Sequence, residues 1–245
     1  MKCPLVMSAD GCPVGSIIIE TMKLPGWMRL KHRREPLAGQ FQRYSHTLPD
    51  RYPWLFGFAA RQLPAQADLN VLSFGCSRGD EVFALRHYFP RAVIKGIDVE
   101  PRNIALCEAR ARAQGMTGVS FRAAAGTQDE ASASYDAIFC LAVLCLGDLT
   151  TTGARRCDPQ LRFEDFERVV ADFSRCLKPS ALLMLHTTNF RFSDTLVAHE
   201  FDTLLEATPQ QMASDVQFDR YNRLIDGPRY CAVAFRKRVA SAATT

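Results

Sequence analysis

Between residues 70 and 188, short apolar runs alternate with longer stretches in which apolar and polar positions are mixed. Apolar runs of four to eight residues are typical of strands, and the longer mixed stretches between them are typical of helices. The predicted strands are 70–75, 92–99, 119–124, 135–144 and 181–188, with helices near 79–89, 101–114 and 163–177 between most of them. This alternation predicts an α/β fold with a mainly parallel sheet covered on both faces.

The N-terminal part of the chain has a different pattern. Residues 1–40 carry several prolines and show no sustained period, so we interpret them as an N-terminal extension. Residues 41–66 are rich in aromatic side chains and include a predicted helix near 53–63. An apolar segment of this kind needs a partner, so we expect it to form a helical and aromatic cover over the domain that follows.

The C-terminal part supplies the rest of a domain that we assign to residues 41–245. Segment 189–214 is too long for a simple connection and is predicted to be an insertion. Two β-like runs follow at 215–221 and 229–236, separated by Asp226-Gly227-Pro228. The short separation predicts an antiparallel hairpin.

Composition narrows the class of protein. With 245 residues, 47% hydrophobic and 23% charged, the chain can bury a substantial core. A net charge of +4 and only short basic groups do not indicate a nucleic-acid partner. The nine cysteines lack a CxxC pair, which disfavours a disulfide framework and a zinc site. No signal peptide and no run long enough to cross a bilayer are evident, so we expect a cytoplasmic protein without a membrane partner.

The candidate chemistry centres on the turn that ends the first predicted strand, Gly75-Cys76-Ser77-Arg78-Gly79. A strand that passes through a glycine turn into a helix presents backbone N–H groups beside the positive end of the helix dipole. Such a turn can bind polar, carboxylate or phosphate groups, although similar turns also occur with no ligand.

A second observation is Asp98, which ends the next predicted strand. A carboxylate about twenty residues beyond the glycine turn can accept both hydroxyls of a ribose. The alternative is that Asp98 only caps the helix that follows. Together, the turn and the acid indicate a cofactor that contains a nucleoside.

The sequence of the glycine turn distinguishes between two classes of such cofactors. Dinucleotide turns need G-x-G-x-x-G so that the backbone can approach a pyrophosphate. Here Ser77 stands where the second glycine would fall, and Asp80 and Glu81 follow, which would repel a pyrophosphate. The same acids could hold the ammonium group of a methionine moiety. S-adenosylmethionine (SAM) is therefore the favoured cofactor.

These residues also resemble a known family. The segments at 74–81, 136–140 and 177–179, together with Asp98, resemble class I SAM-dependent methyltransferases, most of all the chemotaxis-receptor glutamate methyltransferases. The resemblance spans about residues 45 to 188 and implies a Rossmann-like, doubly wound sheet of seven strands, mainly parallel, with the last strand antiparallel.

The resemblance also implies roles for single residues. Glu81 matches the acid that binds the methionine amino group, and Asp98 matches the ribose ligand. Thr47 and Arg51 have the spacing of a Thr and an Arg that contact the cofactor, the alternative being ordinary turn and surface residues. The predicted cofactor contacts are Thr47, Arg51, Phe74, Gly75, Cys76, Ser77, Gly79, Glu81, Asp98, Val99, Ala124, Ala125, Cys140 and Leu141.

The chain departs from that family at several positions. Ala125-Gly126, Leu141-Ala142 and Ser180-Ala181 replace an Asn-Leu pair, an Arg-Asn pair and a glycine pair. The family's small helical N-terminal domain is not recognisable in residues 1–40. A small molecule is therefore the predicted acceptor rather than a receptor glutamate.

The first candidate for a general base or acceptor-orienting group is His186, at the end of the fifth predicted strand, with a hydrogen-bonded structural histidine as the alternative. His46 is a weaker candidate. Tyr44, Tyr52 and Trp54 could form an aromatic wall or simply pack in the core. We interpret Cys140 and Cys145 as core residues.

The sequence thus predicts a SAM-dependent methyltransferase that releases S-adenosylhomocysteine (SAH) and acts on a small molecule. A protein carboxylate methyltransferase and a SAM-binding regulatory protein without catalysis remain as alternatives, the latter because of Ala125, Leu141 and Ala142. A nicotinamide oxidoreductase is the least favoured. No nucleic-acid partner and no metal are expected, and the chain could form a homodimer.

Overall fold

The structure is a computed structural model, and it describes residues 40–42, 47–48, 50–64, 68–158, 160–213 and 215–239. Residues 1–39 of the predicted extension, together with Tyr44 and His46, lie outside the described residues. Within the described ranges, no helix has both the length and the apolar character that a membrane span requires.

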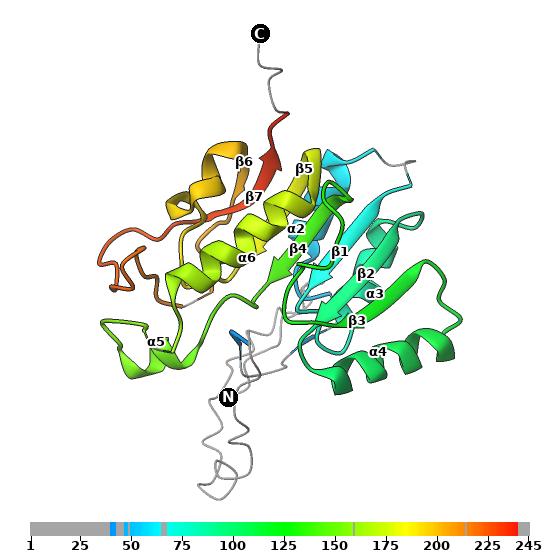
Figure 1. Ribbon diagram of the computed structural model, residues 1–245, viewed down its shortest axis with the longest axis horizontal. Coiled ribbons are helices and arrows are strands. Elements are labelled where there is room, and N and C mark those ends of the chain that lie inside the picture. The colour runs from blue at the N-terminus through cyan, green and yellow to red at the C-terminus, as the bar shows by residue number, and fades with distance from the viewer. Residues whose placement is uncertain are drawn as a thin grey trace, which may run out of the picture. The chain divides into compact units, whose positions relative to one another are not determined.

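The core of the domain is one sheet of seven strands in the order β3-β2-β1-β4-β5-β7-β6 (Figure 1). Strands β1 to β5 pair with parallel neighbours, whereas β7 runs antiparallel to both β5 and β6. This arrangement confirms the predicted Rossmann-like sheet with an antiparallel last strand. The strands are β1 (Asn70–Phe74), β2 (Val93–Asp98), β3 (Val119–Ala123), β4 (Tyr135–Leu141), β5 (Leu177–His186), β6 (Phe201–Glu206) and β7 (Ala232–Lys237).

Helices cover both faces of the sheet because side chains alternate along its strands. On one face Val71 and Phe139 pack in a cluster with residues of α2, α3 and α4. On the other, Leu72 and Ile138 pack with α6, which crosses in front of the sheet in Figure 1. The helices are α2 (Pro53–Gln62), α3 (Asp80–Tyr88), α4 (Pro101–Ala113), α5 (Asp148–Thr152) and α6 (Phe163–Cys176), with short 3-10 helices η1 (Phe192–Asp194) and η2 (Leu196–Glu200).

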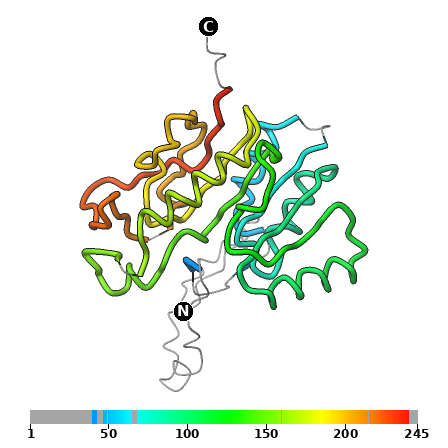
Figure 2. Tube along the Cα trace, in the orientation of Figure 1, coloured from blue at the N-terminus to red at the C-terminus, as the bar shows by residue number. Residues whose placement is uncertain are grey.

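The predicted hairpin of 215–221 with 229–236 is wrong. The partner of β7 is β6, which lies inside the segment predicted to be an insertion. β6 is an edge strand that leaves Asp202, Thr203 and Glu206 exposed. Its sequence therefore shows only a weak hydrophobic pattern. Figure 2 shows the chain leaving β6, running through a long excursion and returning as β7. In that excursion the buried Phe218 makes only isolated bridges, with Phe190 and Leu224.

Candidate active site

A cavity of about 950 Å³, its open mouth included, lies at the carboxyl ends of β1, β2 and β4. This edge of a parallel sheet is where α/β folds bind ligands. The segment before α2 also lines it. The lining residues are Gln40, Phe41, Gln42, Thr47, Leu48, Arg51, Tyr52, Phe56, Phe74, Gly75, Cys76, Ser77, Glu81, Ile97, Asp98, Val99, Glu100, Ala124, Ala125, Leu141, Ala142 and Val143.

The glycine turn is folded tightly against β2. Gly75 has φ +74°, and a Cβ atom there would lie 2.3 Å from a methyl carbon of Val143. The amides of Gly75 and Cys76 both donate to the Ile97 carbonyl, at 2.7 and 2.9 Å, and the Ser77 amide donates to Asp98 at 2.8 Å. The expectation of free turn amides for an anion is therefore wrong for these three residues, because they bond within the protein.

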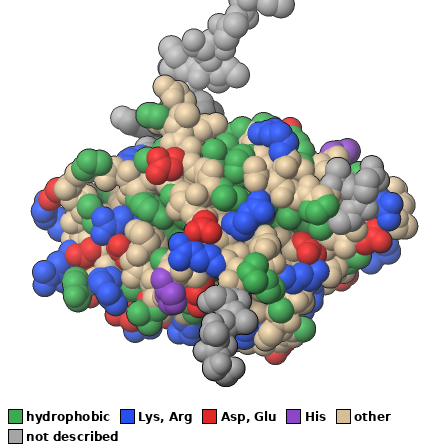
Figure 3. Space-filling view, turned by 90° about the horizontal axis from the view of Figure 1, so that it is seen from above, with side chains coloured by type: hydrophobic (Ala, Val, Ile, Leu, Met, Phe, Trp, Pro, Cys, Tyr) green, Lys and Arg blue, Asp and Glu red, His purple; other side chains and the backbone are tan. Residues whose placement is uncertain are grey.

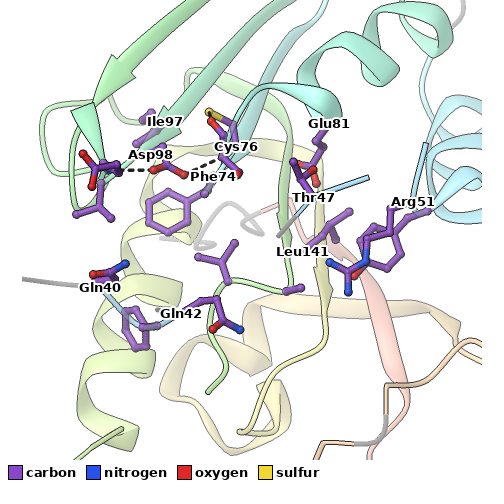
Figure 4. Close-up of a pocket in the computed structure, with 18 of the residues that line it drawn as sticks. Gln40, Gln42, Thr47, Arg51, Phe74, Cys76, Glu81, Ile97, Asp98 and Leu141 are labelled. Atoms are coloured by element: carbon purple, nitrogen blue, oxygen red, sulfur yellow. Dashed lines mark hydrogen bonds between the residues drawn. The ribbon is translucent and has the colours of Figure 1, made fainter. Parts of the chain in front are cut away.

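Asp98 is buried and joins the turn to the start of α4. Its Oδ2 accepts from the Ser77 amide and its Oδ1 accepts from the Glu100 amide at 2.9 Å (Figure 4). Oδ1 also accepts from Asn103 Nδ2 at 3.1 Å. An ionised carboxylate has about four acceptor positions, so these bonds leave about one for a ligand. Asp98 therefore both orders the entry to α4, as the alternative proposed, and faces the cavity.

Glu81 stands at another part of the cavity wall, close to Thr47 and Arg51 in Figure 4. Its Oε1 accepts a hydrogen bond from the buried Ser73 hydroxyl at 2.7 Å. Burial raises the pKa of Glu81 to about 7, although the Ser73 hydroxyl and the Arg51 charge act in the opposite direction. A cation at this point of the cavity would favour the ionised form.

Arg51 and Tyr52 reach the cavity from the turn before α2. The Arg51 guanidinium carbon lies 5.2 Å from the centroid of the Tyr52 ring, a cation–π contact. Tyr52 is 8% exposed, and its hydroxyl has no hydrogen-bond partner of normal geometry among the described residues. The wall of the cavity thus contains a fixed acid, an arginine and a tyrosine.

All the predicted cofactor contacts line this cavity except Gly79 and Cys140. Gly79, at φ +87°, precedes α3, and a Cβ atom there would lie 3.0 Å from the Cys107 sulfur and from the Phe83 ring. Cys140 is fully buried in the core shared with α6, where burial raises its pKa. Both residues therefore lie outside the lining of the cavity.

His186 does not line the cavity. It is buried behind Tyr52 and Trp54, with ring centroids 5.0 and 5.7 Å away. Its Nε2 lies 2.9 Å from the Gln211 carbonyl oxygen and its Nδ1 lies 2.7 Å from Thr187 Oγ1. Because a carbonyl only accepts, Nε2 carries the hydrogen and Nδ1 accepts from Thr187. Burial lowers the pKa of His186, which favours this neutral form. The geometry fits the alternative of a structural histidine.

Several cavity residues were missed by the sequence analysis. Glu100 adds a second carboxylate two residues beyond Asp98, and this Asp-x-Glu spacing was a signal that could have indicated it. Gln40 and Gln42 lie in a segment without periodicity, and Gln42 Nε2 donates to the Cys145 sulfur at 3.4 Å. Val143 follows β4 and touches the turn only in three dimensions, so no sequence signal marked it.

Comparison with known proteins gives one family. The profile of a family described as a methyltransferase domain matches residues 65–226. No curated protein matches the sequence.

Solved structures with similar folds share little sequence. The YcgJ protein of Bacillus subtilis is 14% identical, with 77% of this chain and 100% of that chain covered and a TM-score of 0.48. A phosphoethanolamine N-methyltransferase of Haemonchus contortus bound to SAH is 16% identical, with 57% and 29% covered and a TM-score of 0.42. A geranyl diphosphate C-methyltransferase of Streptomyces coelicolor bound to SAH is 15% identical, with 54% and 44% covered and a TM-score of 0.39. The chain thus spans less than half the length of these last two proteins.

Proposed function

The chain belongs to the methyltransferase-domain family, and from this premise we propose that it transfers a methyl group from SAM to a small-molecule acceptor. Family membership confirms the predicted class I SAM-dependent methyltransferase and its cofactor. The observation that best supports the site assignment is the placement of Glu81, fixed by Ser73, and Asp98, fixed by Ser77, in the wall of one cavity.

The charges of the cavity suit the parts of SAM. Glu81 would pair with the methionine ammonium group, and Arg51 would pair with its carboxylate. Asp98 has about one acceptor position left, so Glu100 would take part in binding the second ribose hydroxyl. The apolar side chains of Ile97 and Val99 would border the adenine. A pyrophosphate would instead meet three carboxylates and the bonded turn amides.

When bound, SAM supplies a methyl group on a sulfonium, and transfer is an in-line displacement. The contribution of the protein is to hold donor and acceptor in contact with the reacting atoms aligned. The Ser73–Glu81 and Ser77–Asp98 bonds serve this purpose because they orient the two acids before the cofactor arrives.

Calorimetry tests the cofactor assignment directly. We expect SAH to bind and NAD to give no heat. Asp98→Ala should abolish SAH binding, whereas Asp226→Ala, which removes an exposed carboxylate paired with Arg155, should not change it. Because Asp98 also holds the turn, the thermal unfolding of each variant without ligand is the control for folding. NAD binding in place of SAH would overturn the proposal.

A second candidate is methylation of a protein carboxylate, which the sequence of the glycine turn favours through its resemblance to the chemotaxis-receptor enzymes. None of the matched proteins named above is a receptor methyltransferase, so this candidate rests on the resemblance alone. An assay with radiolabelled SAM and a glutamate-rich receptor peptide distinguishes the candidates. Base hydrolyses a glutamate methyl ester, so a methylated peptide would release its label as methanol. SAH binding with no turnover of any acceptor would favour a regulatory protein instead, as the small side chains of Ala125 and Ala142 in the cavity suggest.

The distribution of charge on the surface is also consistent with a small-molecule acceptor. On the face in Figure 3, Lys and Arg side chains are interspersed with Asp and Glu, and the described residues there form no extended basic patch. Nucleic-acid binding would need such a patch. Cytoplasmic location and a homodimer stay predictions, the second of which light scattering of the purified protein would measure.

A further inference from the structure

A second cavity, of about 340 Å³ with its open mouth included, lies at the carboxyl end of β5. Its wall comes from that strand end, from the excursion between β6 and β7, and from the start of β7. Apolar and polar side chains are mixed in it. The lining residues are Leu185, Thr187, Thr188, Met212, Ala213, Asp215, Gln217, Tyr230, Ala232 and Val233.

The second cavity adjoins the cofactor cavity across a wall of side chains. Thr187 lines the second cavity and donates to His186, whose ring packs on Tyr52, a lining residue of the cofactor cavity. A second connection passes through Cys145, which accepts a hydrogen bond from Gln42. Burial, together with the nearby charge of Asp215, raises the pKa of Cys145 to about 12. Asp215 therefore lies within electrostatic reach of the shared wall.

Among the described residues that line the second cavity, Asp215 is the only one with an acidic or basic side chain. It is partly buried, and no ion pair links it to any residue of the described ranges. Its one side-chain hydrogen bond there is a long one, from Thr150 Oγ1 at 3.4 Å. A carboxylate in a cavity wall that has no ion-pair partner can accept charge-assisted hydrogen bonds from a bound ammonium group.

Two features of the wall point independently to a ligand. The Tyr52 hydroxyl is buried and has no partner of normal geometry among the described residues. Burial raises the pKa of Tyr52, and the Arg51 charge and the neighbouring Thr187 hydroxyl act in the opposite direction. Thr187 itself has φ +56°, a left-handed conformation that is strained for a β-branched residue. Strained residues and unpaired buried polar groups concentrate at binding sites.

We propose that the second cavity binds the methyl acceptor, and that this acceptor is an amine whose ammonium group pairs with Asp215. The inference rests on the proposed function, since the methyl group must come from SAM in the adjoining cavity. An acceptor carboxylate would be repelled by Asp215, so the same cavity disfavours acids. In this arrangement the nitrogen approaches the methyl group from the side of Tyr52 and His186, and transfer requires the side chains of the shared wall to move apart when both ligands are bound.

The reaction balances without a further reactant. The ammonium group first loses one proton to solvent water, while Asp215 holds the amine in place. The nitrogen lone pair then forms the bond to the methyl carbon while the carbon–sulfur bond breaks and the sulfur keeps the electron pair. The products are an N-methylammonium ion and neutral SAH, with one proton released to solvent.

The methionine methyl group of Met212 offers a direct readout, because Met212 lines the second cavity. Protein labelled with carbon-13 at its methionine methyl groups is saturated with SAH and titrated with propylamine, 1-propanol or propionate, probes of similar size and different charge. Met212→Leu assigns the resonance. We expect propylamine to shift the Met212 resonance to saturation and the other two probes to shift it little.

The matched variants are Asp215→Asn and Asp226→Asn, which remove a carboxylate from the cavity and from the surface, respectively. Asp215→Asn should weaken the binding of propylamine by about tenfold, the loss of one charge-assisted hydrogen bond, and Asp226→Asn should leave it unchanged. With SAM in place of SAH, mass spectrometry should detect N-methylpropylamine. SAH binding without an amine effect at Met212, or equal binding by propionate, overturns this inference alone, whereas failure to bind SAH overturns the proposed function.

Discussion

Two sets of polar groups at the carboxyl edge of the sheet are held in different ways. Glu81 and Asp98 of the cofactor cavity are fixed by partners close in sequence: Glu81 by Ser73, eight residues away, and Asp98 by Ser77, 21 residues away. On the side of β5, β6 and β7, the partners are remote: Asn189 binds the Leu146 amide 43 residues away, and Asn222 binds the Phe163 amide 59 residues away.

The proposed cofactor side, which holds Glu81 and Asp98, is thus fixed by bonds within one strand–helix–strand unit, whereas the proposed acceptor side, at β5, β6 and β7, is assembled from residues far apart in the chain. A strand, a turn and a helix suffice to place Glu81, so its geometry survives changes elsewhere. His186, by contrast, depends on the Gln211 carbonyl and on the rings of α2 and the turn before it. If the acceptor binds on this side as we propose, its loop residues can change without disturbing Glu81 and Asp98.

The largest expected effect comes from breaking the cofactor side at its turn. Gly75→Ala combines a left-handed φ with a clash against Val143, so we expect a loss of about 3 kcal/mol in the free energy of unfolding. SAH binding should fall at least about tenfold, a change of about 1.4 kcal/mol, because both residues line the cavity. Urea unfolding and calorimetry measure the two effects.

A control at Gly115 separates the cost of the left-handed backbone from the cost of the clash with Val143. Gly115 has φ +60° and open space around it, so Gly115→Ala should cost only about 1 kcal/mol, the conformational part. Val143→Ala in the Gly75→Ala background should recover the part due to the clash. Equal stability of Gly75→Ala and the wild-type protein would contradict the structure of the turn.

The local character of the cofactor side is also why the sequence predicted it. The apolar run of β1, the glycines and Asp98 are signals within about thirty residues, the length of one strand–helix–strand unit. The acceptor side lacked such signals. Strand β6 has one exposed face, Asp215 is a single acid in a loop, and the position of His186 behind Tyr52 follows from packing between segments more than 100 residues apart. Glu100 was not predicted because Asp98 alone could account for binding both hydroxyls of the ribose.

An intermediate effect is expected on the acceptor side. Asn189 is fully buried, accepts from the Leu146 amide at 2.6 Å and donates to the Val216 carbonyl at 2.7 Å. Asn189→Ala leaves both groups unpaired and should lower the free energy of unfolding by about 2 kcal/mol. SAH affinity should change by less than about threefold, which is below 1 kcal/mol.

The matched control is Asn70→Ala, at the start of β1, where the side-chain amide makes one partly buried bond to the Ser134 carbonyl. Its cost should be about 1 kcal/mol. If Asn189→Ala lost SAH binding as completely as Gly75→Ala, the two sides would not be separable in the way described above.

The sharpest test of the cofactor side is the dependence of its SAH affinity on pH. Because burial raises the pKa of Glu81 to about 7, the folded protein without ligand holds this proton more tightly than the unfolded chain does. The contribution of Glu81 to stability therefore decreases as the pH rises from the ordinary value of a glutamate towards 7. Binding has the opposite sign, since only ionised Glu81 pairs with the methionine ammonium group. SAH affinity should rise up to about pH 7, by at most about tenfold per pH unit, and then level off. Glu81→Gln should bind SAH weakly with a flat profile between pH 5.5 and 8, and the same slope in this variant would assign the titration to another group.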